Sequence, residues 1–213
     1  MRPDLRSLLA VVLLALALPL RAQNLLDDFF IAVANDRAGD VRAMLLRGLD
    51  PNSVDVNGDP ALVVAVRNGS AASVDVLLAA KADPNRRNRY GDTPMMVAAL
   101  KGNAGIMKAL RAKSAEVDGK GWTPLIYAAT GGHDDLVRWL LGEGADINAQ
   151  SPNGTTALMM AVRENKYSTA LLLIARGANV NHRNEIGASA LDWAKRNDDT
   201  VMVDRLRNAG ARD

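Results

Sequence analysis

A glycine recurs along this 213-residue chain at a nearly constant spacing. Three of the four intervals are 33 residues long and one is 30, and the positions are Gly58, Gly91, Gly121, Gly154 and Gly187. A fixed period of this length is typical of repeat proteins, in which one unit is too small to bury its own apolar face and needs neighbours. The period therefore predicts an array of stacked units rather than a single globular core.

The clearest unit, Gly121–Gln150, reads GWTPLIYAATGGHDDLVRWLLGEGADINAQ. Thr123 can accept a hydrogen bond from a free backbone N–H in the first turn of a helix, and the proline after it fits the first helical position. Two glycines end that short helix, and Asp134–Leu141 is predicted to form a second helix with its apolar residues on one face. Gly144 suits the left-handed conformation that ends the second helix. Each unit is therefore predicted to be a helix–turn–helix.

The segments TPL, AA, GH, LL and GADIN of this unit resemble the ankyrin repeat. The resemblance implies an all-α fold, an ankyrin-repeat solenoid of six helix–turn–helix units joined by short β-hairpin loops. One domain would cover residues 23–213, with repeats at about 24–56, 57–89, 90–119, 120–152, 153–185 and 186–213. The third repeat is three residues short. We expect this shorter hairpin to open the concave face and to leave Trp122 more exposed than its repeat position implies.

Residues 1–22 have the layout of a secretory signal peptide. Arg2 and Arg6 precede an unbroken apolar run, Leu8–Leu18, which is shorter than the roughly 20 residues needed to span a bilayer. We expect cleavage after Ala22, a periplasmic or secreted protein, and no stable membrane span in the mature chain; an uncleaved anchor is the alternative. The whole chain has 26 basic and 24 acidic residues. The leader's own surplus of basic residues accounts for the difference, so no nucleic-acid partner is expected.

The sequence contains none of the usual catalytic or metal-binding patterns. It has no cysteine, which excludes thiol catalysis, thiolate metal sites and disulfides. His133 and His182 fall in different units, and no carboxylate pattern near them suggests a metal site. His133 occupies a position where ankyrin repeats commonly carry histidine, so we expect it to hydrogen-bond locally. Without a nucleophile elbow or a phosphate-binding glycine loop, we expect no enzyme, no cofactor and no small-molecule substrate.

A protein partner is what the resemblance implies, because ankyrin-like proteins bind through the hairpin tips and the exposed side of the first helices. Three of the eight aromatic residues of the chain, Tyr90, Trp122 and Tyr127, fall at such positions in adjacent units, and Tyr and Trp are frequent in binding hot spots. The alternative for Tyr127 is a half-buried core position that it shares with Trp193. The basic run Arg86–Arg89 suits either a solvated hairpin or an acidic partner surface. The candidate partner-binding residues are Tyr90, Trp122, Tyr127, Arg87, Arg89, Leu100, Lys101, Lys120 and Met160.

These observations together predict an exported, non-enzymatic protein–protein interaction module that binds an unidentified protein through its concave face. Two other functions remain open at this point. One is a membrane-anchored adaptor that keeps its leader, and the other is an accessory or regulatory subunit of an exported enzyme.

Overall fold

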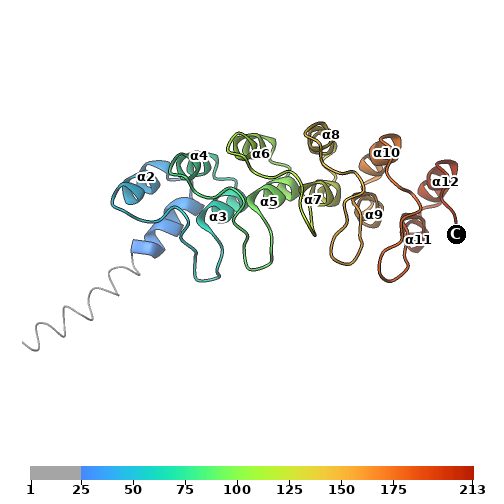
Figure 1. Cartoon of the computed structure of the whole chain (residues 1–213), viewed down its shortest axis with the longest axis horizontal. Helices are drawn as coiled ribbons and strands as arrows, with labels where there is room; N and C mark the ends of the chain where they lie inside the picture. Colours follow the sequence, from blue (N-terminus) through green and yellow to red (C-terminus); the bar gives the residue numbers. More distant parts are fainter. Residues whose placement is uncertain (1–24) are drawn as a thin grey trace, which may run out of the picture. The chain divides into compact units, whose positions relative to one another are not determined.

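The computed structural model describes residues 25–213; the expected leader, residues 1–22, lies outside the described residues. The chain divides into two compact units, unit 1 (Met1–Ala82) and unit 2 (Asp83–Asp213). The expected all-α repeat architecture is confirmed, because both units are built from pairs of short helices (Figure 1). The described residues form no β-strand. The loops expected to be β-hairpins are turns instead, with isolated bridges at Val54–Pro60 and Gln150–Thr156.

Unit 1 contains two helix pairs. The first pair comprises a helix that covers residues 25–34 of the described chain and α2 (Ala38–Leu46). The second comprises α3 (Ala61–Asn68) and α4 (Ala71–Ala79), and α4 packs on both α2 and α3. Asp36 joins the two pairs, since its carboxylate accepts a hydrogen bond of 2.7 Å from the backbone N–H of Ser73.

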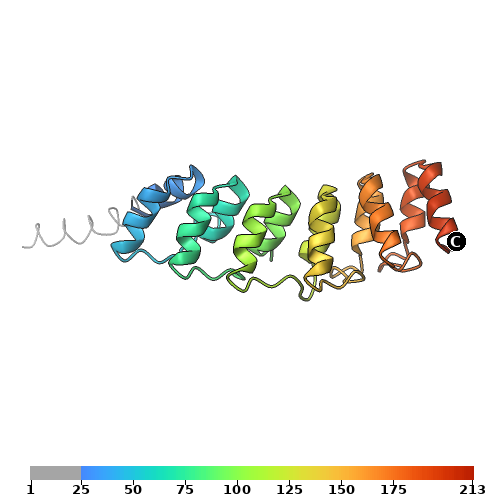
Figure 2. The same cartoon turned by 90° about the horizontal axis from the view of Figure 1, so that it is seen from above.

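Unit 2 contains four helix pairs, which follow one another side by side (Figure 2) and whose helices form two rows (Figure 1). The first helices are α5 (Pro94–Lys101), α7 (Pro124–Gly131), α9 (Ala157–Arg163) and α11 (Ala190–Arg196), and each packs on the next. The second helices are α6 (Ala104–Arg111), α8 (Asp134–Gly142), α10 (Tyr167–Ala175) and α12 (Thr200–Asn208). Contacts between α8 and α10 and between α10 and α12 continue the second row.

Each first helix of unit 2 begins at a hydroxyl side chain. Thr93, Thr123, Thr156 and Ser189 each accept a hydrogen bond from the backbone N–H three residues later. Such a cap contributes about 1 kcal/mol by satisfying a donor that has no partner within the helix. The cap predicted at Thr123 is therefore confirmed, and the shared capping chemistry explains why the four helices start at equivalent positions.

A second recurring hydrogen bond, the loop rung, joins successive loops of unit 2. In each rung a side-chain oxygen accepts from a backbone N–H of the next loop, at 2.8 to 2.9 Å. The pairs are Asn85 with Glu116, Asp118 with Asp146, Asn148 with Asn179, and Asn181 with Arg212. The rungs tie the loops to one another on one side of the helix rows.

The loops before α5, α9 and α11 close on themselves. Asn88, Ser151 and Asn184 donate their backbone N–H to the carbonyl four residues later, at 2.9 to 3.0 Å. The loop before α7 is three residues shorter and lacks this turn, although Asp118 still forms its rung. The shortening thus removes the closed turn and leaves the link between loops in place.

Candidate partner-binding surface

The surface considered is the first-helix face of unit 2, which comprises the exposed side of α5, α7, α9 and α11 and the loops that precede them. Its most exposed aromatic side chain is Tyr90, with 70% of its surface accessible. The loop beneath it is held by Asn88, a buried residue whose side-chain oxygen accepts from the N–H groups of Tyr90 and Asp92 at 2.9 Å each. The tip therefore presents Tyr90 from a fixed backbone.

Two arginines of the same loop have different roles. The guanidinium of Arg89 stacks on the Tyr90 ring, with its carbon 4.8 Å from the ring centroid, a cation–π contact that limits the movement of both side chains. Arg87 turns back and donates to the carbonyl of Gly91 at 2.5 Å. Arg89 thus extends the exposed surface around Tyr90, whereas Arg87 contributes mainly to the shape of the loop.

Trp122, in the loop before α7, lies against Tyr127 of α7. Their ring centroids are 5.7 Å apart and the planes are inclined by 51°. The Tyr127 hydroxyl donates to Asp92 at 2.5 Å and so joins two repeats. Burial raises the pKa of Tyr127 well above its usual value, and the hydrogen bond to the Asp92 carboxylate adds to the shift. Tyr127 is therefore a structural link with one exposed edge, as the core alternative suggested.

Trp122 is half-buried against Tyr127. Thr155 and Ala188, which occupy the same repeat position in other units, are buried. The indole is thus more accessible than these two counterparts, but it lies against a neighbouring ring rather than projecting into solvent.

The remaining candidates divide by burial. Lys101 and Lys120 are exposed, and Leu100, at the end of α5, is 39% accessible. Met160 is 6% accessible, so it does not have the exposed position expected for it. Its helix, α9, lies between α7 and α11, and these neighbours cover its side chain.

Sequence reasoning missed an arginine–tryptophan cluster on α9 and α11. The guanidinium carbons of Arg163 and Arg196 lie 5.4 and 4.8 Å from the centroid of the Trp193 ring. The indole N–H is buried and has no hydrogen-bond partner among the described residues, so packing and stacking hold the ring. The repeat period itself could have indicated the pair, because Arg163 and Arg196 occupy the same position in consecutive repeats.

Both histidines serve the links between repeats. His133 makes a hydrogen bond of 3.0 Å to the carbonyl of Leu100, and His182 makes one of 2.8 Å to that of Gly154. Within residues 25–213, no group of His, Asp and Glu side chains is arranged to hold a metal ion.

A separate observation concerns the lengths of the helices. No helix in the described part of the chain is both long enough and apolar enough to cross a membrane.

Stacked helix pairs, recurring caps and rungs between loops define a helical repeat protein. The family model of ankyrin repeats matches residues 29–120, 73–151, 106–184 and 132–212. The chain therefore belongs to the ankyrin repeat family, whose repeats indicate a protein–protein interaction module and whose members are generally not enzymes.

Relatives match the chain over parts of its length. It is 44% identical to human Ankyrin repeat domain-containing protein 17 over 69 residues. These residues make up 32% of this chain and 3% of that protein. It is 35% identical over 85 residues to a putative ankyrin repeat-containing protein of Treponema pallidum, or 40% of this chain and 28% of that one. The chain thus spans less than a third of either relative. The ankyrin repeat domain of human ASB11 has the same fold, with a TM-score of 0.77 and 24% identity over 86% of this chain and 84% of that one.

Proposed function

We propose that this protein is an exported, non-enzymatic module that binds a partner protein through the first-helix face of unit 2. The observation that carries the proposal is Tyr90, a large side chain that is 70% exposed on a loop fixed by the buried Asn88. A rigid aromatic side chain supplies contact area with little loss of conformational freedom on binding. The hydrogen bonds of Asn88 stabilise the loop, and they also fix the backbone from which Tyr90 would meet a partner.

The proposed contact surface extends from Tyr90 along the neighbouring repeats. Arg89 stacks on the tyrosine, and Leu100 and Lys101 add an exposed apolar and a charged group at the end of α5. Trp122, half-buried on Tyr127, would form the floor of the surface. Hot spots commonly combine aromatic anchors with a charged rim, and this arrangement fits that description.

Site-specific photo-crosslinking in cells tests the proposed surface. A photoreactive amino acid at position 90 is expected to give a discrete crosslinked product. The matched control is Arg138, which is exposed on α8 in the second row of helices, and the same group there is expected to give none. Equal products at the two positions, or no product at position 90, would refute the proposed surface.

Export is proposed from the leader-like residues 1–22. Fractionation followed by sequencing of the protein's N-terminus is expected to find a mature chain that begins at Gln23 in the periplasmic or external fraction. A full-length chain in the membrane fraction would instead support the alternative of an uncleaved anchor.

A further inference from the structure

The cluster formed by Arg163, Trp193 and Arg196, here called the Trp193 site, is not explained by the stability of the repeats. Arg163 comes from α9, and the other two residues come from α11. Two guanidinium groups lie within 5.4 Å of the centroid of one indole ring. Both groups are positively charged and carry planar N–H donors, which suit a carboxylate.

The backbone beneath the Trp193 site is fixed by Asn197. The side-chain amide of Asn197 donates to the carbonyls of Val162 and Arg163 at 3.0 and 3.2 Å, and to the side-chain oxygen of Asn165 at 3.0 Å. These bonds clamp the end of α11 to the end of α9. The backbone that carries the two arginines is therefore fixed before any ligand arrives, which lowers the cost of binding.

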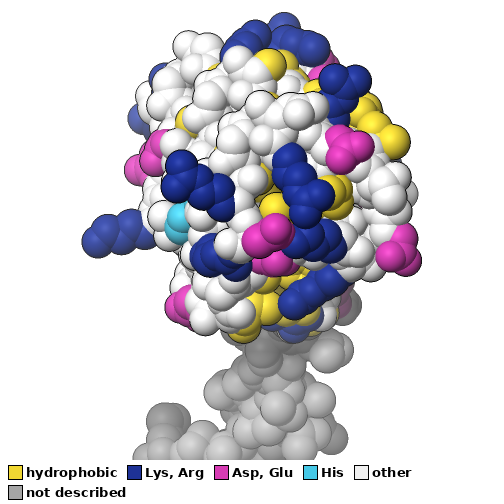
Figure 3. Space-filling model, turned by 90° about the vertical axis from the view of Figure 1, so that its right-hand side faces the viewer, with side chains coloured by type: hydrophobic (Ala, Val, Ile, Leu, Met, Phe, Trp, Pro, Cys, Tyr) yellow, Lys and Arg dark blue, Asp and Glu magenta, His cyan; other side chains and the backbone are white. Residues whose placement is uncertain are grey.

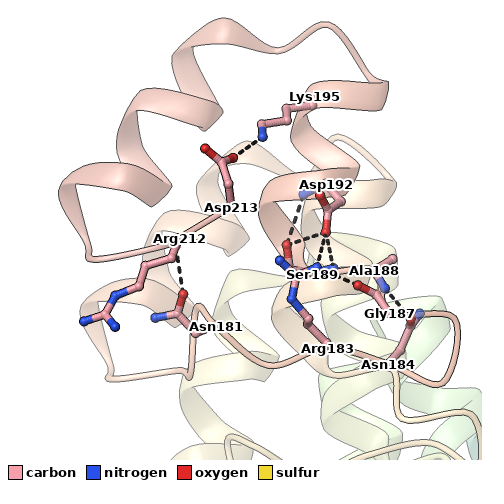
Figure 4. Close-up of polar contacts among 10 residues, drawn as sticks. All are labelled: Asn181, Arg183, Asn184, Gly187, Ala188, Ser189, Asp192, Lys195, Arg212 and Asp213. Atoms are coloured by element: carbon pink, nitrogen blue, oxygen red, sulfur yellow. Dashed lines mark hydrogen bonds and ion pairs between the residues drawn. The ribbon is translucent and has the colours of Figure 1, made fainter.

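Two carboxylates near this end of unit 2, Asp192 and Asp213, are engaged by other groups (Figure 4). Asp192 accepts from the backbone N–H of Ser189 at 2.8 Å and from Arg183 at 3.0 Å, and Asp213 pairs with Lys195. The backbone hydrogen bond from Ser189 is the main reason why the pKa of Asp192 is lowered, so this carboxylate is charged and already satisfied.

The arginines of the Trp193 site have little internal compensation. Among residues 25–213, the one carboxylate within ion-pair distance of Arg163 is that of Glu164, at 3.3 Å, and both side chains are exposed, so this pair is worth little. Arg196 has no carboxylate within ion-pair distance among the described residues. Figure 3, which faces the C-terminal end of the chain, shows Lys and Arg side chains gathered across that surface with Asp and Glu between and around them.

We propose that the Trp193 site binds a carboxylate side chain of an acidic segment in the partner protein. Guanidinium groups bind carboxylates through paired N–H donors, and stacking on an indole leaves those in-plane donors available. A polypeptide fits better than a nucleic acid, because the chain as a whole is nearly balanced, with 26 basic and 24 acidic residues, and lacks the large positive surplus typical of phosphate binding. This inference rests on the proposed function and specifies the chemistry of the partner.

Fluorescence anisotropy with labelled peptides tests the proposal on the full mature chain. The probe is a labelled oligoglutamate peptide, with oligoglutamine and oligolysine peptides of equal length for comparison. We expect the glutamate peptide alone to bind, more weakly as salt rises because exposed charges are screened. The double variant Arg163→Gln with Arg196→Gln is expected to lose about tenfold in affinity.

The matched control is Arg138→Gln with Arg176→Gln, two exposed arginines of α8 and of the end of α10, and it is expected to bind as the wild type does. The variant Arg163→Lys with Arg196→Lys keeps the charge but loses the planar donors, and intermediate affinity is expected. Circular dichroism would show that each variant is folded.

The proposal would be overturned if the folded wild-type protein did not bind the glutamate peptide. It would also be overturned if the two glutamine double variants lost affinity equally. A third contrary result would be tighter binding of a single-stranded oligonucleotide than of the glutamate peptide. If any of these occurs while the crosslink at position 90 persists, protein binding at the first-helix face stands and only the acidic chemistry of the partner is refuted.

Discussion

The loops before α5 and α7 perform the same connection with different numbers of residues. The longer loop closes around Asn88, which accepts two backbone N–H groups, and it projects Tyr90 into solvent. The shorter loop has no such turn, and the aromatic residue that follows it, Trp122, lies against Tyr127. The three missing residues therefore remove the closed turn but not the link between loops, because each loop still forms its rung, from Asn85 in the longer loop and from Asp118 in the shorter one.

The largest expected change in stability comes from removing the closed turn of the longer loop. Asn88→Ala leaves two partly buried N–H groups without their acceptor and is expected to lower the free energy of unfolding by about 2 kcal/mol. Asn88→Asp keeps the acceptor, as Asp55 does in the equivalent loop of unit 1, and is expected to cost less than about 1 kcal/mol. Urea unfolding followed by circular dichroism measures both. Equal losses would mean that the oxygen of Asn88 is not what stabilises the loop.

A smaller effect is expected where α7 meets the longer loop. Tyr127→Phe removes the hydrogen bond to Asp92 and should cost about 1 kcal/mol. Tyr167→Phe, on α10, serves as the control, because no hydrogen bond of the Tyr167 hydroxyl is present among the described residues. Little change in Tyr127→Phe relative to this control would show that the short contact with Asp92 does not stabilise the fold.

The same tyrosine also predicts a pH dependence. Its folded pKa is raised above the unfolded value of about 10, mainly by burial, so the folded protein holds the phenol proton more tightly than the unfolded chain does. This contribution is complete below about pH 10, and it is lost progressively as pH rises beyond that value. Unfolding experiments between neutral and strongly alkaline pH should show a decline that is shallower in Tyr127→Phe. An equal decline in both proteins would assign it to other groups.

The smallest effect is expected from restoring the missing length. Three glycine or serine residues inserted between Gly119 and Lys120 should change stability by less than about 1 kcal/mol, because closure entropy grows slowly with loop length and the rung from Asp118 precedes the insertion. The same insertion between Arg89 and Tyr90 interrupts the turn around Asn88 and should cost more. A larger loss at the short loop would reveal that its tight connection is itself stabilising.

Much of the fold could be predicted from the sequence because its determinants are local. Thr123 caps a helix within four residues, and the glycine period sets the spacing of the units. The exposure of Tyr90 also follows from its place in a polar loop. Burial of Met160 and the stacking of Arg163 on Trp193 depend on neighbouring repeats, whose contacts a single unit does not specify. The composition of the proposed surface could therefore be predicted only in part.

The rungs between loops have a consequence for how such a chain can change over generations. Each rung needs a particular side chain on one side only, since the other side contributes a backbone N–H. The donors belong to four different residues, Glu116, Asp146, Asn179 and Arg212, and any replacement except proline preserves them. A whole repeat can therefore be duplicated or deleted, and the new neighbours can still form a rung. The side chains of the donor residues can change without loss of the rung.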